Sequence, residues 1–234
     1  MKFRLATPAY IVDINRLTDL KYVRDSGDHL SIGALTRHCE IEKNEMVTSN
    51  AGVLAQATHN VGDPQVRHRG TIGGAIAHGD PASDIPSALL ALQATVVARG
   101  PEGERVISID DFFTGFLETD LREDEMLTEV RVPKLPDAKW SFQKFNRRAQ
   151  DWAIVGASIV CSKNHAGVGL VNMSSVPFRS EAVESALLDG ANAEEAGDLA
   201  AEGTEAPTDL NASKGYREHL ARVLVRRGLQ EAGR

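Results

Sequence analysis

The fold is decided by one stretch of the chain, Val61-Gly62-Asp63-Pro64-Gln65-Val66-Arg67-His68-Arg69-Gly70-Thr71-Ile72-Gly73-Gly74. It continues directly into a second run, Ala75-Ile76-Ala77-His78-Gly79-Asp80-Pro81-Ala82-Ser83-Asp84. Two adjacent glycines after a β-branched residue let the main chain approach a bulky anion, because no Cβ intervenes. Their N–H groups, together with the Thr71 hydroxyl, can form a concave site for a phosphate or pyrophosphate. Asp84 then supplies an acceptor for the hydroxyl groups of a sugar or ribityl chain.

A simpler interpretation of the same residues is a Gly-Gly bulge in a strand, followed by an Asp-Pro turn. The stretch matches neither G-x-G-x-x-G nor a P-loop, so neither nucleotide-binding motif is satisfied. Taken alone, the glycine pair favours this simpler interpretation.

Composition excludes several classes of protein. The 234 residues include Lys+Arg 26 against Asp+Glu 33, which gives a formal net charge of -7. Nucleic acids and anionic membranes both need a basic footprint, so neither is an expected partner. The chain has no run of about 18 apolar residues that could span a membrane, and it does not begin with a signal peptide. Cys39 and Cys161 are too few for an iron–sulfur or thiolate-zinc site and suggest a cytoplasmic protein, so redox chemistry here needs an organic cofactor or another subunit.

The hydrophobic pattern predicts short strands and turns first, with helices between them. Strands are expected at 10–14, 20–24, 30–34, 96–98, 106–109 and 126–133. Helices are expected at 50–60 and 85–92, with a short helical turn at 110–113. Gly62-Asp63-Pro64 is expected to end the first helix and open a loop.

Lys134-Leu135-Pro136-Asp137 is the best candidate for a domain boundary, because two prolines enclose a short polar link. Three strands are expected after it, at 140–147, 153–162 and 168–174, and the rest of the chain has a helical pattern. The predicted domains are therefore residues 1–136 and residues 137–234, the second being a small α+β unit.

The whole run from Val61 to Gly74 closely resembles the FAD-binding medium subunits of the molybdenum hydroxylases, above all the carbon monoxide dehydrogenase medium-subunit family. There the pattern is D-P-Q-V-R-N-R-G-T-I-G-G-N, followed by A-H-x-D-P-A-x-D-x-P. Further counterparts extend along the chain: Val12-Asp13-Ile14-Asn15, Ser31-Ile32-Gly33-Ala34-Leu35-Thr36, Lys144-Phe145, Arg147-Arg148, Asp151-Trp152-Ala153 and the helix at 216–227. The resemblance implies an α+β fold, with an FAD-binding domain of the PCMH/vanillyl-alcohol-oxidase-like type followed by a small C-terminal domain of antiparallel sheet plus helices.

Carried over residue by residue, the resemblance implies that the FAD pyrophosphate is held by Thr71, Ile72, Gly73, Gly74 and Ala75. It also implies a further polar contact from Asp84, packing of Leu127 beside the flavin ring, and Lys144 near the polar edge of that ring. Trp152 would lie beside the isoalloxazine. A cation can tune the potential of a reduced flavin, and an aromatic face can stack on a planar ring.

Each of these roles has a structural alternative. Leu127 could be an ordinary core residue, Lys144 a solvated strand lysine, and Trp152 a residue that fills the seam between the domains. His59, His68 and His78 are spaced nine and ten residues apart, which is not the pattern of a zinc site, so no metal is expected.

Two departures from the family bear on cofactor affinity. A family member begins its FAD domain with a second glycine loop, A-G-G-x-S-L-x-P-x-M-K, whereas Met1-Lys2-Phe3-Arg4-Leu5-Ala6 aligns with the end of that loop. Without the loop, several charge-assisted hydrogen bonds of about 1.5–3 kcal/mol each are lost, so weakened or absent FAD binding is expected. In addition, His68 and Ala75 stand where the family has asparagines.

The resemblance implies an electron-transfer flavoprotein subunit of a molybdenum hydroxylase. Its partners would be a large subunit with the molybdopterin cofactor and a small [2Fe–2S] subunit, in a cytoplasmic heterotrimer or a dimer of heterotrimers, with or without peripheral association at the inner membrane. FAD would pass electrons to an external acceptor. The alternative is a truncated, cofactor-free scaffold that only docks the partner subunits.

Overall fold

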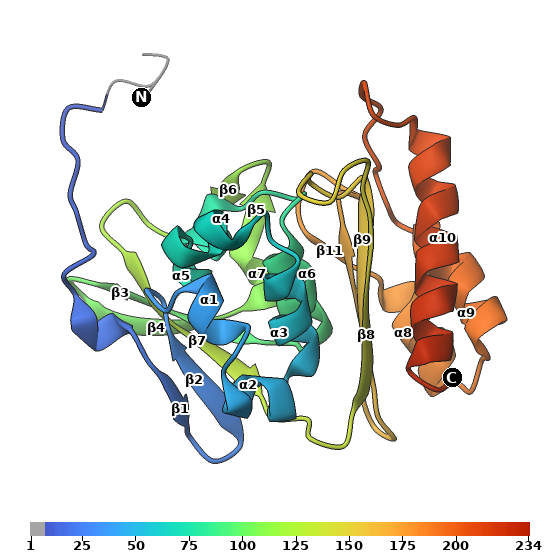
Figure 1. Ribbon diagram of the computed structural model, residues 1–234, viewed down its shortest axis with the longest axis horizontal. Helices are drawn as coiled ribbons and strands as arrows, with labels where there is room; N and C mark the ends of the chain where they lie inside the picture. Colours follow the sequence, from blue (N-terminus) through green and yellow to red (C-terminus); the bar gives the residue numbers. More distant parts are fainter. Residues whose placement is uncertain (1–7) are drawn as a thin grey trace.

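A computed structural model describes residues 8–234, which form alternating layers of sheet and helix (Figure 1). The first layer is a five-stranded antiparallel sheet with the order β1-β2-β7-β3-β4. Its strands are β1 Val23–Asp25, β2 His29–Gly33, β7 Met126–Pro133, β3 Thr95–Gly100 and β4 Gly103–Ser108. The predicted strands at 30–34, 96–98, 106–109 and 126–133 are thus present, as is the hairpin that joins β1 to β2.

A layer of short helices covers one face of this sheet, and their apolar side chains form a common core with it (Figure 1). The helices are α1 His38–Ile41, α2 Glu45–Asn50, α3 Gly52–His59, α4 Pro64–Arg69, α5 Ile72–His78 and α6 Asp84–Ala91. Smaller elements are the 3₁₀ helices at Thr18–Leu20 and Leu199–Ala201, the helical turn α7 Ile109–Phe112, and the two-stranded β5 Phe113–Gly115 and β6 Glu118–Thr119. Helices α3 and α6 correspond to the two helices expected at 50–60 and 85–92.

A second antiparallel sheet, of four strands in the order β11-β10-β9-β8, packs on the other side of α3 and α6 (Figure 1). It consists of β8 Lys139–Phe145, β9 Val155–Cys161, β10 Ala166–Val171 and β11 Phe178–Arg179. Its outer face is covered by α8 Glu181–Leu188, α9 Ala193–Asp198 and α10 Lys214–Glu231. Because helices cover both faces, every residue of β9 and β10 is buried.

Helix α6 lies directly on β10, and two glycines make this close approach possible. A Cβ built on Gly167 would lie 1.8 Å from the Ala91 carbonyl oxygen, and one on Gly169 would lie 2.0 Å from that of Ser87. Any larger residue would force the helix away from the strand. The contact fixes the position of α6, whose first residue is Asp84.

The structure differs from the expected elements at three places. Residues 10–14 form no strand. Gly62-Asp63-Pro64 opens a helix rather than a loop, because the Asp63 side chain accepts from the Val66 N–H at 2.9 Å and proline is favoured at the first helical position. The glycine pair lies inside helix α5 and not in a strand bulge.

Residues 1–7, which include the segment aligned with the family's first glycine loop, lie outside the described residues. Within residues 8–234, no helix has the length and apolar character needed to cross a bilayer. The division of the chain at residues 136 and 137 remains a prediction.

Candidate functional site

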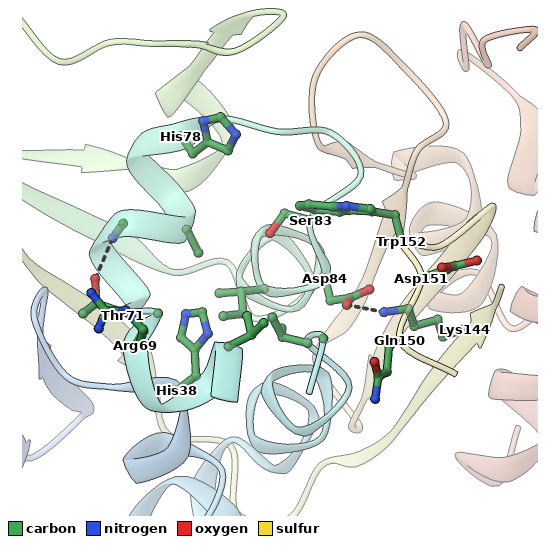
Figure 2. A pocket seen from close by; sticks show the side chains of 17 residues that line it. His38, Arg69, Thr71, His78, Ser83, Asp84, Lys144, Gln150, Asp151 and Trp152 are labelled. Atoms are coloured by element: carbon green, nitrogen blue, oxygen red, sulfur yellow. Dashed lines mark hydrogen bonds and ion pairs between the residues drawn. The ribbon is translucent and has the colours of Figure 1, made fainter. Parts of the chain in front are cut away.

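A cavity of about 560 Å³ opens between the helical layer and the loop that follows β8 (Figure 2). This volume lies within the range of small-molecule sites, about 300–1,000 Å³. One side is formed by the start of α5 with neighbouring parts of α1 and α4, and the other by the start of α6, the end of β8 and residues 150–152. The cavity therefore joins segments that are about 110 residues apart in sequence.

Six of the nine residues singled out from the sequence line this cavity: Thr71, Gly74, Ala75, Asp84, Lys144 and Trp152. Ile72 and Gly73 are buried on the inner side of α5, away from it. Leu127 is only 5% exposed on β7 and packs in the core between the first sheet and the helices, without lining the cavity.

Thr71 is the N-cap of α5 and determines how the glycine segment folds. Its hydroxyl oxygen accepts from the Gly74 N–H at 3.1 Å, and its carbonyl accepts from the Ala75 N–H at 3.0 Å (Figure 2). A threonine at this position satisfies a donor that would otherwise be free in the first turn. The Thr71 hydroxyl donates no hydrogen bond among the described residues, and Thr71 lines the cavity.

The other two N–H groups of the segment are also used. The Ile72 N–H donates to the Thr36 carbonyl at 3.1 Å, and the Gly73 N–H donates to the Ala34 carbonyl at 2.8 Å. The expectation that free main-chain N–H groups of this segment grip an anion is therefore wrong in this structure. The physical reason is that the segment is the first turn of a helix docked on the end of β2, and the docking and the cap consume its donors.

The two glycines of the pair have different surroundings. A Cβ on Gly73 would lie 2.6 Å from the Ala34 Cβ, so glycine is required for α5 to dock. A Cβ on Gly74 would meet only the Thr71 hydroxyl oxygen, at 3.0 Å, and Gly74 lines the cavity. The absence of a side chain at Gly74 thus leaves space in the cavity, whereas its absence at Gly73 allows α5 to pack against Ala34.

Asp84 and Lys144 form a buried ion pair on the opposite side of the cavity (Figure 2). The Lys144 Nζ lies 2.6 Å from Asp84 Oδ2 and also donates to the Asn60 carbonyl at 3.0 Å. Asp84 Oδ1 is buried and has no hydrogen-bond partner among the described residues. Burial raises the pKa of Asp84 to about 6, although Lys144 opposes the shift. An unsatisfied buried acceptor costs about 1–3 kcal/mol, so a ligand hydroxyl that donated to Oδ1 would stabilise the site.

Trp152 lies at the mouth of the cavity, in the loop between β8 and β9. Its side chain is 61% exposed, and Figure 2 shows the indole extending across the opening above Asp84. Gln150 and Asp151 of the same loop complete this edge. A large apolar ring left in solvent beside a cavity is available to cover a planar ligand.

His38 is a cavity residue that the sequence did not reveal. It is 4% exposed, and neither ring nitrogen has a hydrogen-bond partner among the described residues. Gly70 packs directly against the ring, since a Cβ there would come within 2.7 Å of it. Burial lowers the pKa of His38 and so disfavours the charged form of the ring. A lone histidine in a turn carries no local sequence signal, because its isolation depends on the packing of α1 against α4.

Comparison with known proteins assigns the chain to a family. A model described as "FAD binding domain in molybdopterin dehydrogenase" matches residues 1–135, and one described as "CO dehydrogenase flavoprotein C-terminal domain" matches residues 140–232. The chain belongs to the FAD-binding medium subunits of the molybdenum hydroxylases. It is thus a subunit of an FAD-dependent oxidoreductase.

Relatives of this medium subunit serve different oxidoreductases. The chain is 36% identical to the carbon monoxide dehydrogenase medium chain of Hydrogenophaga pseudoflava, over 99% of this chain and 84% of that protein. It is equally identical to the glyceraldehyde dehydrogenase medium chain of Sulfolobus acidocaldarius, over 99% and 85%. The solved carbon monoxide dehydrogenase of Hydrogenophaga pseudoflava, which lacks the Mo-pyranopterin moiety, superimposes with a TM-score of 0.96 at 37% identity, over 100% of this chain and 85% of that one.

The cavity fits the cofactor that the family implies. FAD offers hydroxyl donors along its ribityl chain and anionic oxygens on its diphosphate. The cavity presents a buried acceptor without a donor at Asp84 Oδ1, the free hydroxyl hydrogen of Thr71, and the unpaired ring of His38. The three residues line one cavity of about 560 Å³, and their polar groups complement those of the cofactor.

Proposed function

We propose that this chain is the electron-transfer subunit of a molybdenum hydroxylase, which receives electrons from a [2Fe–2S] subunit and delivers them through FAD to an external acceptor. The observation that carries the proposal is the cavity that gathers Thr71, Gly74, Asp84 and Lys144 around unsatisfied buried polar atoms. Bound FAD would supply reversible two-electron chemistry, which no side chain of this protein can provide.

Different residues of the cavity would contact different parts of FAD. Thr71 would donate its hydroxyl hydrogen to a diphosphate oxygen, and Gly74 and Ala75 would leave room for that group. Asp84 Oδ1 would accept from a cofactor hydroxyl while its Oδ2 holds Lys144 in place. The Lys144 ammonium would then stand at the polar edge of the flavin, where a positive charge favours the reduced, anionic ring.

The remaining residues predicted from the sequence are Trp152, Leu127, Ile72 and Gly73. Trp152 would cover the ring at the cavity mouth and limit its contact with water. Packing of Leu127 beside the ring stays a prediction of the resemblance, because Leu127 lies in the core and does not line this cavity. Ile72 and Gly73 would act indirectly, by fixing α5 on the sheet.

The partners we propose are a large molybdopterin subunit and a small [2Fe–2S] subunit, in a cytoplasmic heterotrimer or its dimer. Cys39 and Cys161 are not disulfide-bonded, and no group of three or more potential metal-ligating side chains occurs within residues 8–234. The metal centres would therefore be held by the partners. Substrate choice would belong to the large subunit, since relatives of similar identity serve carbon monoxide and glyceraldehyde dehydrogenases.

A second candidate function is a scaffold that docks the partner subunits without a cofactor. It is favoured by one observation, the internal use of the N–H groups of Ile72, Gly73, Gly74 and Ala75. With these donors occupied, the chain would have to hold a diphosphate through side chains alone, which would weaken the binding.

Purification of the complex from its native host separates the two functions. The electron-transfer proposal predicts three co-purifying subunits with molybdenum, iron and one extractable FAD per copy of this chain, and flavin bleaching when substrate is added without acceptor. A complex that contains molybdenum and iron but no flavin would support the scaffold. A chain that purifies without either partner would contradict both.

A further inference from the structure

Neither ring nitrogen of buried His38, on the Thr71 side of the cavity, makes a hydrogen bond of normal geometry among the described residues, although the Thr71 main chain lies close enough to raise the pKa of the ring. Figure 2 shows its ring on the same side as Thr71 and Arg69, across the cavity from Asp84 and Lys144. The position is held by main-chain packing, because the His38 N–H donates to the Gly70 carbonyl at 3.1 Å while Gly70 presses against the ring. Gly70 therefore closes one side of the ring.

Among the charged groups near His38, cations outnumber the one nearby carboxylate, which belongs to Glu42. Arg37 and Glu42 flank it on α1, and Arg67 and Arg69 approach from α4. Glu42 is already occupied, at 3.0 Å from Arg67. Further away, the cavity is bordered by His78 of α5, the Asp84–Lys144 pair, and Asp151.

The surroundings of His38 thus oppose a positive charge on its ring. Burial, with Arg37 and Arg67, lowers the pKa of the ring, and the Thr71 main chain and Glu42 offset only part of this shift. An opposite charge within about 4–6 Å favours the protonated form. A phosphate placed on this side of the cavity would provide it.

We propose that His38 is a phosphate-binding residue of this site and takes up one proton from solvent when FAD binds. The proposal rests on the proposed function, in which FAD occupies the cavity, and deepens it by making cofactor affinity depend on pH. The proton adds to the free ring nitrogen, so the imidazolium presents two N–H donors, one of them to a diphosphate oxygen. His38 would replace part of the anion binding that the occupied N–H groups of α5 cannot give.

The sign of the pH dependence follows from linkage. A group that gains a proton on binding strengthens binding at low pH and weakens it as pH rises. The FAD dissociation constant should therefore increase by up to about tenfold per pH unit between the pKa of free His38 and that of the complex. Below and above this interval His38 contributes no pH dependence.

The test is isothermal titration calorimetry of the full chain with FAD at pH 7, in buffers of different ionisation enthalpy. Wild-type protein should take up close to one proton per FAD bound. His38→Gln, which keeps a hydrogen-bonding side chain that cannot be protonated, should lose this uptake, while its dissociation constant at pH 9 stays within about threefold of the wild-type value. His68→Gln is the matched control, because His68 is an exposed histidine on α4 that does not line the cavity.

Two further measurements distinguish a role of His38 from a role of His78 and from proton uptake unrelated to the diphosphate. Riboflavin lacks the diphosphate and should bind without proton uptake. His78→Gln tests the other histidine of the cavity, which is exposed. Proton uptake that persists in His38→Gln, or disappears in His78→Gln alone, would overturn the role of His38 and leave the proposed function standing. If the wild-type chain binds no FAD at any pH between 6 and 9, the proposed function fails and the inference fails with it.

Discussion

Asp84 and Lys144 form a buried ion pair whose burial is energetically unfavourable in the absence of a ligand. Both are almost fully buried, one carboxylate oxygen is unsatisfied, and the carboxyl group has an unusually high pKa of about 6. A group of this kind is costly to the ligand-free protein, and such groups gather at functional sites. The pair also links the start of α6, which carries Asp84, to the end of β8, which carries Lys144.

Asp84 should make stability depend on pH in a predictable direction. Its pKa is about 6 in the folded chain against 3.8 for an exposed group, so the folded state binds the extra proton between these values. The contribution of Asp84 is therefore fully present below pH 4 and is lost as pH rises through about 6. Relative to Asp84→Asn, the free energy of unfolding of the wild type should fall by ~3 kcal/mol across this interval.

Urea unfolding of both proteins at half-unit steps from pH 4 to pH 7 measures this difference. Asp84→Asn together with Lys144→Met provides the reference in which neither group of the pair titrates. A difference that stays constant with pH would show that the Asp84 carboxyl group is not desolvated as the structure implies.

Lys144→Met should be strongly destabilising, because it leaves a buried carboxylate without its partner. The expected loss in free energy of unfolding at pH 7 is about 3–5 kcal/mol. Lys134→Met is the matched control: its ammonium lies 2.9 Å from the Asp25 carboxylate at an exposed site, where an ion pair contributes about 1 kcal/mol or less. Equal losses in the two variants, measured by urea unfolding, would contradict the special position of Lys144.

Some residues of the cavity can be predicted from the sequence, and others cannot. Asp84, Lys144 and Thr71 could be named because they stand in motif positions shared with a family. His38 could not, because its two unpaired nitrogens result from the way Gly70 closes over it. Which atoms of a residue lack a partner is set by tertiary packing, and no local pattern records it.

Helix α5 shows that two adjacent glycines can have separate functions. Gly73→Ala should destabilise the protein by about 1–3 kcal/mol, because the new methyl group would overlap Ala34. Gly74→Ala should change stability less, because the gain of about 0.5–1 kcal/mol from replacing a helical glycine is offset by the 3.0 Å approach of the new methyl group to the Thr71 hydroxyl oxygen. It should nevertheless weaken FAD binding by about tenfold or more, equivalent to 1.4 kcal/mol, because its methyl group enters the cavity.

Thermal unfolding and FAD titration of these variants check both halves of this prediction. Gly215→Ala on α10 is the control, since nothing lies within 4 Å of its Cβ and it is far from the cavity in sequence. Equal FAD affinity in Gly74→Ala and Gly215→Ala would mean that Gly74 does not face the cofactor.

Periodic elements were predictable, and elements that depend on capping were less so. Strand β7 was expected at 126–133 and occupies Met126–Pro133, because its alternating apolar residues reflect one buried face. Helix α4 is not among the predicted helices, because a proline after a helical pattern suggests a loop, whereas Asp63 followed by proline starts a helix in the structure. The strand expected at 10–14 is absent, since a β-rich sequence forms a strand only where it has a neighbour to pair with.

On the scale of the whole molecule, the cavity exists because two sheets enclose one helical layer (Figure 1). The first sheet positions α5, and the second sheet positions α6 through the glycines of β10 and supplies Lys144 directly. This arrangement could be inferred only through the resemblance to a family, because strand patterns alone do not specify which sheet packs on which helices. The resemblance gave the site residues, but the internal hydrogen bonds of α5 became visible only in the folded chain.

The central claim is that this cavity holds FAD, and equilibrium dialysis of the full chain against FAD tests it most directly. We expect one FAD per chain at saturation, with Thr71→Val binding at least about tenfold more weakly because it lacks the hydroxyl, while the exposed control Thr48→Val binds like the wild type. Failure to bind FAD, or binding that Thr71→Val and Gly74→Ala leave unchanged, would contradict the claim.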